Sequence, residues 1–207
     1  MQRARGSDSW ENVTENGLDQ QVHGDTIMTT QKGSPAQTVH QVPERKQTSV
    51  GLYVTSEEAY EMWRANPERV HIIDVRTPEE YVFVGHAEMA RNIPILFVKH
   101  EWDVETNQFA VELNPNFIAE VKHLFAPTDT LLVMCRSGDR SAKAVNALAK
   151  AGFVNVYNII DGMEGDMVDD PKSKHHGKRM KNGWKNCGVP WTYDVNPDQT
   201  CLISVRK

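Results

Sequence analysis

The 207-residue sequence predicts an α/β fold with a mainly parallel central sheet and helices on both faces. Two observations lead to this prediction. Short runs dense in Val, Ile and Leu, typical of strands buried on both faces, stand at residues 70–76, 130–134 and 154–159. Helical patterns separate these runs, and strands that alternate with helices form parallel sheets.

The first predicted helix follows Thr55. Thr55 and Glu58 have the spacing of a capping box at a helix start. Three apolar residues then share one helical face: Ala59, Met62 and Trp63. The strand at residues 70–76 comes next, and Pro78 opens a short helix.

The second half of the chain repeats the alternation. Residues 99–113 are expected to form a polar connection, and Asn114 with Pro115 starts another helix. An Ala-rich helix follows the strand at 130–134 and ends at Gly152.

Composition divides the chain into three parts. Residues 1–48 are rich in Gln, Thr, Ser, Gly and Asn, which favours a disordered arm. We expect one folded domain over residues 49–193, interrupted by a basic insertion at 166–182, and a tail at 194–207. The five cations of the insertion either form a solvated loop or recruit an anionic partner: Lys172, Lys174, Lys178, Arg179 and Lys181.

Charge and hydropathy exclude several classes of protein. A net charge of -5 provides no general attraction to nucleic acid or anionic lipid. No segment has the roughly 20 apolar residues of a membrane span, and the N-terminus lacks the apolar region of a secretory signal. We therefore expect a cytoplasmic protein that binds neither nucleic acid nor membrane; a periplasmic location would require an export segment outside this sequence.

The three cysteines are Cys135, Cys187 and Cys201. Their odd number and the absence of a CxxC pair argue against a zinc cage and a dense disulfide framework. Adjacent His175 and His176 point in different directions and do not complete a ligand set with Cys187. We expect no metal, no cofactor and at least one free thiol.

Cys135 stands at the carboxyl end of a predicted central strand and faces the start of a helix. This edge of an open α/β sheet is where ligands bind. The turn directs N–H groups inward and the helix adds partial positive charge, so a bound group should be anionic. With Arg136 and Arg140 nearby, Cys135 is a candidate thiolate nucleophile rather than an inert buried residue.

Four segments, in this order and spacing, resemble the rhodanese homology domain: DVRTPEEY, GHAEMARNIPI, CRSGDRS and DGMEG. The resemblance covers about residues 52–165. It implies a thiosulfate-type sulfurtransferase that carries a sulfane sulfur on Cys135. The donor would be a small sulfur anion, and the acceptor a thiol, cyanide or a protein. The residues that would form the pocket are Arg136, Ser137, Gly138, Asp139, Arg140 and Ser141.

Loop length separates two branches of this fold. Sulfur carriers have CxxxxR, whereas related phosphatases have a loop longer by one residue; here Arg140 closes the shorter form. The alternatives are a phosphatase or arsenate reductase of the same fold, and a binding or regulatory module. Asp74 and Arg76 are expected to form a structural pair near the site, and His86 to lie in a structural turn.

Overall fold

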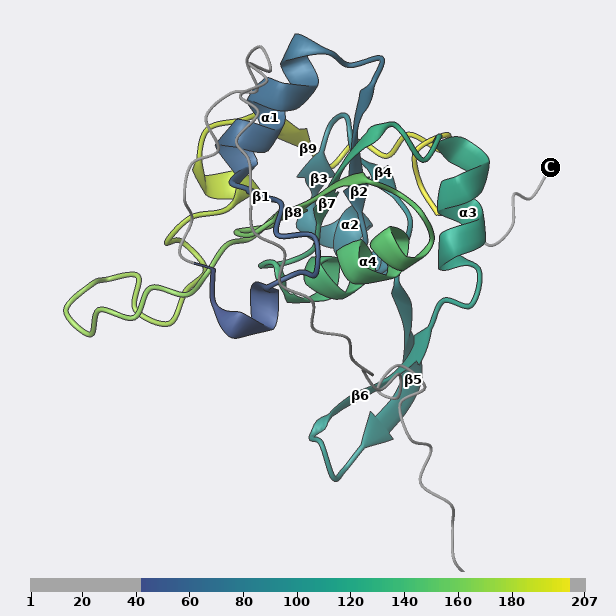
Figure 1. Cartoon of the computed structure of the whole chain (residues 1–207). Helices are drawn as coiled ribbons and strands as arrows, with labels where there is room; N and C mark the ends of the chain where they lie inside the picture. The colour runs from purple at the N-terminus through teal and green to yellow at the C-terminus, as the bar shows by residue number, and fades with distance from the viewer. Residues whose placement is uncertain (1–41, 202–207) are drawn as a thin grey trace, which may run out of the picture. The chain divides into compact units, whose positions relative to one another are not determined.

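A five-stranded parallel sheet is the centre of the fold in the computed structural model, which describes residues 42–201 (Figure 1). The order of its strands is β1-β8-β7-β2-β4, and each neighbouring pair is parallel. The strands of this sheet are β1 (Tyr53–Val54), β2 (Val70–Asp74), β4 (Arg91–Asn92), β7 (Thr130–Met134) and β8 (Asn155–Ile159).

Helices cover both faces of this sheet. The helical elements are η1 (Glu44–Lys46), α1 (Ser56–Ala65), α2 (Pro78–Val84), α3 (Phe117–Leu124), α4 (Asp139–Lys150) and η2 (Trp184–Asn186). Apolar residues of α3 and α4 form one core with the sheet, and those of α1 and η2 form the other. The predicted α/β architecture is confirmed.

Two helices begin with reciprocal capping boxes. The Thr55 side chain accepts a hydrogen bond from the Glu58 N–H, and Glu58 accepts one from the Thr55 N–H at 2.7 Å. Thr77 and Glu80 repeat the arrangement at the start of α2. Each box satisfies two N–H groups that a helix start leaves without partners.

The region predicted as a polar connection, residues 99–113, is instead most of an antiparallel hairpin. Its strands are β5 (Leu96–Asp103) and β6 (Gln108–Leu113), which form a separate two-stranded sheet. The prediction was wrong because strands exposed on both faces alternate charged with apolar residues and lack the dense apolar run of a buried strand. A third sheet pairs β3 (His86–Ala87) with β9 (Trp191–Thr192).

Residues on both sides of the predicted domain, 49–193, make contacts with it. Most of the predicted arm, residues 1–48, lies outside the described residues, but its last part packs on the domain through Lys46, which is 2% exposed. The predicted tail also packs: the Gln199 carbonyl accepts a hydrogen bond from the Asn92 N–H of β4 at 2.7 Å. Residues 202–207 lie outside the described part.

The insertion at 166–182 forms a looped lobe beside the domain (Figure 1). Its backbone is held by isolated bridges between Met167 and Arg179 and between Val168 and His176. Among residues 42–201, no helix is long and apolar enough to cross a membrane.

Candidate active site

Cys135 is the first residue after β7, the middle strand of the parallel sheet. The side chain is 1% exposed and lies at the carboxyl edge of the sheet, as the sequence predicts. Helix α4 begins at Asp139, so Cys135 to Gly138 form a tight turn between strand and helix.

Polar groups surround the sulfur. The Gly138 N–H donates to Cys135 Sγ at 3.2 Å, and the Ser141 hydroxyl lies 3.3 Å from the same atom. Gly138 is the N-cap of α4, so the positive end of the helix dipole also faces this turn. The Gly138 N–H and the helix start both favour negative charge on the sulfur.

The turn depends on glycine at two positions. Gly138 has φ +102°, and a Cβ there would lie 2.4 Å from the Ile160 carbonyl oxygen. Gly162 has φ +61°, and its Cβ would lie 2.5 Å from the Cys135 carbonyl oxygen. Residues with a side chain rarely adopt such backbone angles, and a side chain at either position would also collide with neighbouring backbone atoms. Both positions therefore require glycine.

The segment after β8 forms backbone hydrogen bonds with the cysteine turn. The Met163 N–H donates to the Cys135 carbonyl at 2.8 Å, and the Glu164 N–H to the Arg136 carbonyl at 2.9 Å. The DGMEG motif therefore fixes the backbone of the cysteine turn. Its Asp161 accepts hydrogen bonds from Ser56 and from the Gly183 N–H, which joins this segment to α1 and η2.

Asn158 of β8 links the turn to the N-terminal part of the fold. Its side-chain oxygen accepts a hydrogen bond from the Ser141 hydroxyl at 2.7 Å. Its amide nitrogen donates to the carbonyls of Gly138 and Lys46 at 3.1 and 2.9 Å. Asn158 is fully buried and orients Ser141 toward Cys135.

Arg140 pairs with Glu80 of α2. Its two terminal nitrogens each donate to one carboxylate oxygen at 2.6 Å. Burial opposes the charge of Arg140, but hydrogen bonding and charge attraction to Glu80, with a smaller effect of Cys135, raise the pKa of Arg140. Burial likewise opposes the charge of Glu80, and the contacts with Arg140 outweigh it and lower the pKa of Glu80.

The pair predicts a pH-dependent contribution to stability. Folding lowers the pKa of Glu80. The pair therefore stabilises the fold fully at pH values above the pKa of Glu80 in the unfolded chain, and this stabilisation is lost as pH falls through the lower pKa of the folded state. We expect Glu80→Gln, which keeps the capping geometry, to lower the free energy of unfolding by about 2 kcal/mol at neutral pH. In urea titrations, the difference in unfolding free energy between Glu80→Gln and the parent should shrink below pH 4.5, the ordinary pKa of a glutamate side chain.

A matched control is the exposed neighbour Glu79. Glu79→Gln should change the free energy of unfolding by less than about 0.5 kcal/mol at either pH. Equal effects of the two substitutions, or a Glu80→Gln effect independent of pH, would contradict the assignment.

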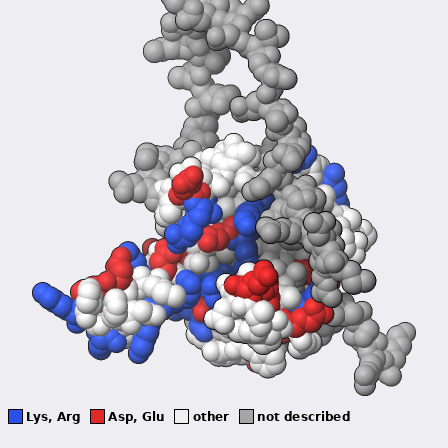
Figure 2. Space-filling view, turned by 90° about the horizontal axis from the view of Figure 1, so that it is seen from below, with Lys and Arg blue, Asp and Glu red and all other residues white. Residues whose placement is uncertain are grey.

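A hollow of about 490 Å³ lies beside the turn. Its lining comes from η1, the cysteine turn and the insertion: Pro43, Arg45, Arg136, Ser137, Asp139, Asp166, Met167, Asp169, Arg179 and Lys181. Figure 2 shows the lobe of the insertion at the left, with Lys and Arg along its outer rim. Other Lys, Arg, Asp and Glu residues gather between this lobe and the rest of the domain.

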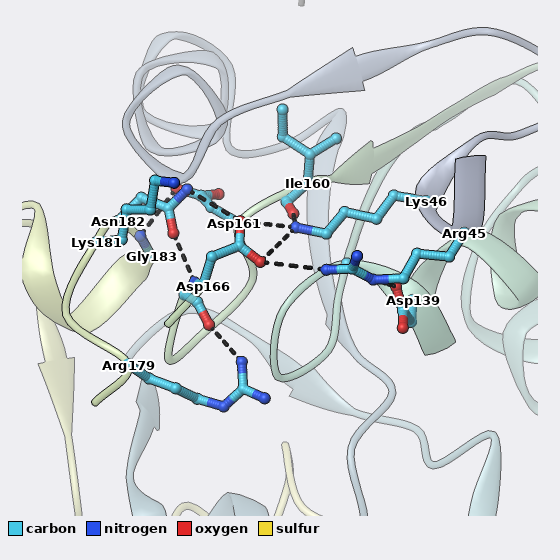
Figure 3. A network of polar contacts seen from close by, with 12 residues as sticks. Arg45, Lys46, Asp139, Ile160, Asp161, Asp166, Arg179, Lys181, Asn182 and Gly183 are labelled. Atoms are coloured by element: carbon cyan, nitrogen blue, oxygen red, sulfur yellow. Dashed lines mark hydrogen bonds and ion pairs between the residues drawn. The ribbon is translucent and has the colours of Figure 1, made fainter. Parts of the chain in front are cut away.

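The charges around the hollow are partly paired. Arg45 contacts both Asp139, at 3.0 Å, and Asp166, at 3.6 Å (Figure 3). The buried Lys46 ammonium donates to Asp166 at 2.8 Å and to the Ile160 carbonyl at 2.9 Å. By contrast, the exposed Arg136 side chain has no hydrogen bond or ion pair within residues 42–201.

The other candidate residues, Asp74, Arg76 and His86, are buried and bonded to neighbouring residues. Asp74 and Arg76 are both 0% exposed and ion-paired at 2.6 Å, and Arg76 also donates to the Gly85 carbonyl. His86 is buried, stacks on Tyr81 at 3.7 Å between ring centroids, and contacts the Tyr81 carbonyl through Nδ1. Within the described chain, no group of three or more His, Cys, Asp or Glu residues is placed to hold a metal ion.

Sequence reasoning missed three residues that surround the loop: Lys46, Glu80 and Asn158. Each lies far from Cys135 in the chain, and no local pattern connects them to it. The only available signal was the capping-box spacing of Thr77 and Glu80, which predicts a helix start but no contact with Arg140.

The chain is similar in sequence to a known domain family and to several known proteins. The family model for the rhodanese-like domain matches residues 55–167. An uncharacterized protein of Rickettsia prowazekii is 31% identical over 142 residues, which are 68% of this chain and 96% of that protein. "Thiosulfate sulfurtransferase 16, chloroplastic" of Arabidopsis thaliana is 38% identical over 90 residues, 44% of this chain and 68% of that protein.

A crystal structure of a protein from M. tuberculosis is also similar. It is 31% identical, covers 68% of this chain and 96% of its own, and has a TM-score of 0.49. The matched family model spans β2, the cysteine turn and the DGMEG segment, which are the parts that build the site. The chain therefore belongs to the rhodanese-like domain family.

Proposed function

We propose that the protein is a sulfurtransferase that moves a sulfane sulfur from a small anionic donor, such as thiosulfate, through a persulfide on Cys135. The acceptor is a thiophile: a thiol, cyanide or a protein. The observation that carries this proposal is the position of Cys135 Sγ at the start of α4, where it accepts a hydrogen bond from the Gly138 N–H. This N–H and the positive end of the helix can stabilise both an attacking thiolate and the persulfide that it forms.

The reaction has two displacement steps. The Cys135 thiolate attacks the outer sulfur of thiosulfate, a sulfur–sulfur bond forms to Sγ, and the bond to the sulfonate breaks with its electron pair leaving as sulfite. The acceptor, for example cyanide, then attacks the outer persulfide sulfur. Thiocyanate departs and the Cys135 thiolate is restored. A preformed thiolate needs no general base, consistent with the buried, structural position of His86.

The position of Arg140 favours sulfur over phosphoryl transfer. A phosphatase needs cationic and N–H donors around three equatorial oxygens. Here both terminal nitrogens of Arg140 are engaged by Glu80, and the short turn directs the Gly138 N–H at Sγ. This arrangement supports a single transferred sulfur rather than a larger oxyanion.

The hollow beside the turn is the proposed approach for the donor. Arg136 and Arg179 line it and offer N–H groups to an anion, although one nitrogen of Arg179 donates to the Gly165 carbonyl at 2.7 Å. Lys172, Lys174 and Lys178 of the insertion are exposed and lie outside this lining. We propose that Arg179 helps to recruit the donor and that these three lysines belong to a solvated loop.

This separation leads to a kinetic prediction. Arg179→Ser should raise the KM for thiosulfate about threefold and weaken its salt dependence, with kcat little changed, because it removes a charge that attracts the donor before the chemical step. Lys174→Ser removes an equal charge outside the hollow and should change neither constant. Identical kinetics for the two variants would rule out the hollow as the approach.

The test of the function is transfer of sulfur from thiosulfate to cyanide, followed as thiocyanate, beside hydrolysis of an aryl phosphate. The parent should transfer sulfur and leave the phosphate ester intact, and Cys135→Ser should lose at least about a thousandfold in rate. Cys135-dependent ester hydrolysis would identify a phosphatase instead. Absence of both activities would favour a binding module.

A further inference from the structure

The β5–β6 hairpin has one face made entirely of apolar pairs. Directly opposed residues share a face of a two-stranded ribbon. The opposed pairs on this face are Leu96 with Leu113, Val98 with Val111, and Trp102 with Phe109. The register shifts between Val98 and Trp102, but Trp102 still pairs with Phe109, which lies on the same face of β6 as Val111. We call these six residues the hairpin face.

The hairpin face is open to solvent. The exposed fractions of its side chains are 39% for Val98, 53% for Trp102, 55% for Phe109, 57% for Val111 and 49% for Leu113. The Trp102 and Phe109 rings pack edge to face at 5.2 Å. In Figure 1 the hairpin extends away from the five-stranded sheet. An isolated two-stranded ribbon is at best marginally stable in water, so a covering partner would stabilise it.

We propose that the hairpin face is the surface through which two copies of this chain associate. The face has no charged member, so a second copy related by a two-fold axis places apolar pairs on apolar pairs without opposing like charges. A foreign protein partner would be expected to meet polar or charged groups that fix its orientation, and none of the six paired residues offers one.

The charges of the hairpin are compatible with this arrangement. Lys99 and Glu112 form an ion pair at 3.2 Å; Glu112, one residue from Val111 in β6, lies on the opposite face and would remain in water. The end of the hairpin carries Glu101, Asp103 and Glu105. Antiparallel stacking of two hairpins puts these acidic ends at opposite sides of the dimer. The same acidic end disfavours an anionic lipid surface as the occupant.

The area of the face places the expected interface in the small class of protein interfaces. With roughly 150–250 Å² for each aromatic side chain and less for each aliphatic one, the exposed fractions leave on the order of 400 Å² of open apolar surface. Two such faces bury roughly 800 Å², slightly below the roughly 1,000 Å² of a specific interface before residues at the rim are added. We therefore expect a weak dimer with a Kd on the order of 10 µM.

Sedimentation velocity of the full chain over about 1 to 200 µM tests the proposal, because this range brackets the expected Kd. The parent should shift from monomer to dimer across the range. Val111→Lys places a charge at the centre of the face and should weaken association at least tenfold. Gln108→Lys adds the same charge to the same strand on the opposite face, beside Asp103, and should dimerise like the parent.

Two outcomes would overturn the proposal. One is a parent that remains monomeric throughout the range, since the face would then serve another occupant or none. The other is a dimer that Val111→Lys and Gln108→Lys weaken equally. Matching circular dichroism spectra of the variants and the parent would exclude loss of folding, which is not expected because Val111 is 57% exposed. The proposal is independent of the chemistry at Cys135.

Discussion

Insertion of one glycine between Gly138 and Asp139 should lower the rate of sulfur transfer from thiosulfate to cyanide at least a hundredfold. The Gly138 N–H lies 3.2 Å from Cys135 Sγ, and the Gly138 Cα packs against the Ile160 carbonyl so closely that no Cβ fits. One added residue extends a chain by about 3.5 Å, and a misplacement of about 1 Å already can cost about a hundredfold in rate.

A glycine inserted between Glu105 and Thr106 is the matched control. It also lengthens a turn by one residue, but in the exposed β5–β6 hairpin rather than at the buried cysteine. Its transfer rate should stay within about twofold of the parent's. Retention of more than a third of the parent rate by the variant lengthened at Gly138 would show that the geometry of the short turn is not required for sulfur transfer.

Arg76→Met should lower the free energy of unfolding by about 3–5 kcal/mol, the cost of leaving a buried charge without its partner. Arg76 and Asp74 are both 0% exposed, and the guanidinium contacts both carboxylate oxygens as well as the Gly85 carbonyl. Removing it leaves the buried Asp74 side chain without its ion-pair partner. Urea denaturation at neutral pH would measure the loss.

Arg64 provides a matched control, because it pairs with Glu61 on the exposed side of α1. Arg64→Met should cost less than about 1 kcal/mol, as is usual for surface ion pairs. The double variant Asp74→Leu/Arg76→Met should recover at least half of the loss, because two apolar residues leave no charge unpaired. A loss below about 1 kcal/mol for Arg76→Met would contradict a structural role for this pair.

Sequence reasoning predicted the parts of the fold whose signals are local. The strands β2 and β7 are dense in apolar residues because both of their faces are covered, and such runs can be recognised from the sequence. The capping box at Thr55 is likewise a pattern of adjacent residues. The β5–β6 hairpin escaped prediction because neither of its faces packs on the central sheet, so no buried run marks it.

The residues of the site are likewise of two kinds: some are marked by a local sequence pattern, and others are brought together only by the fold. Cys135 through Ser141 are consecutive, so one loop pattern predicts them together. Glu80, Asn158 and Lys46 reach the loop from three other elements, and only the parallel order of β8, β7 and β2 brings the first two beside it. Composition also misplaced Lys46 in the arm, because a lysine in a polar segment gives no sign of burial against Asp166.

The most direct test of sulfur transfer through Cys135 is the intact mass of the protein after treatment with thiosulfate. We expect a gain of one sulfur, about 32 Da, that cyanide removes. Cys187→Ser and Cys201→Ser should keep the gain, because burial raises the pKa of both thiols and so disfavours the reactive thiolate. Cys135→Ser should lose it. An unchanged mass of the parent, or the same gain in Cys135→Ser, would contradict a persulfide on Cys135.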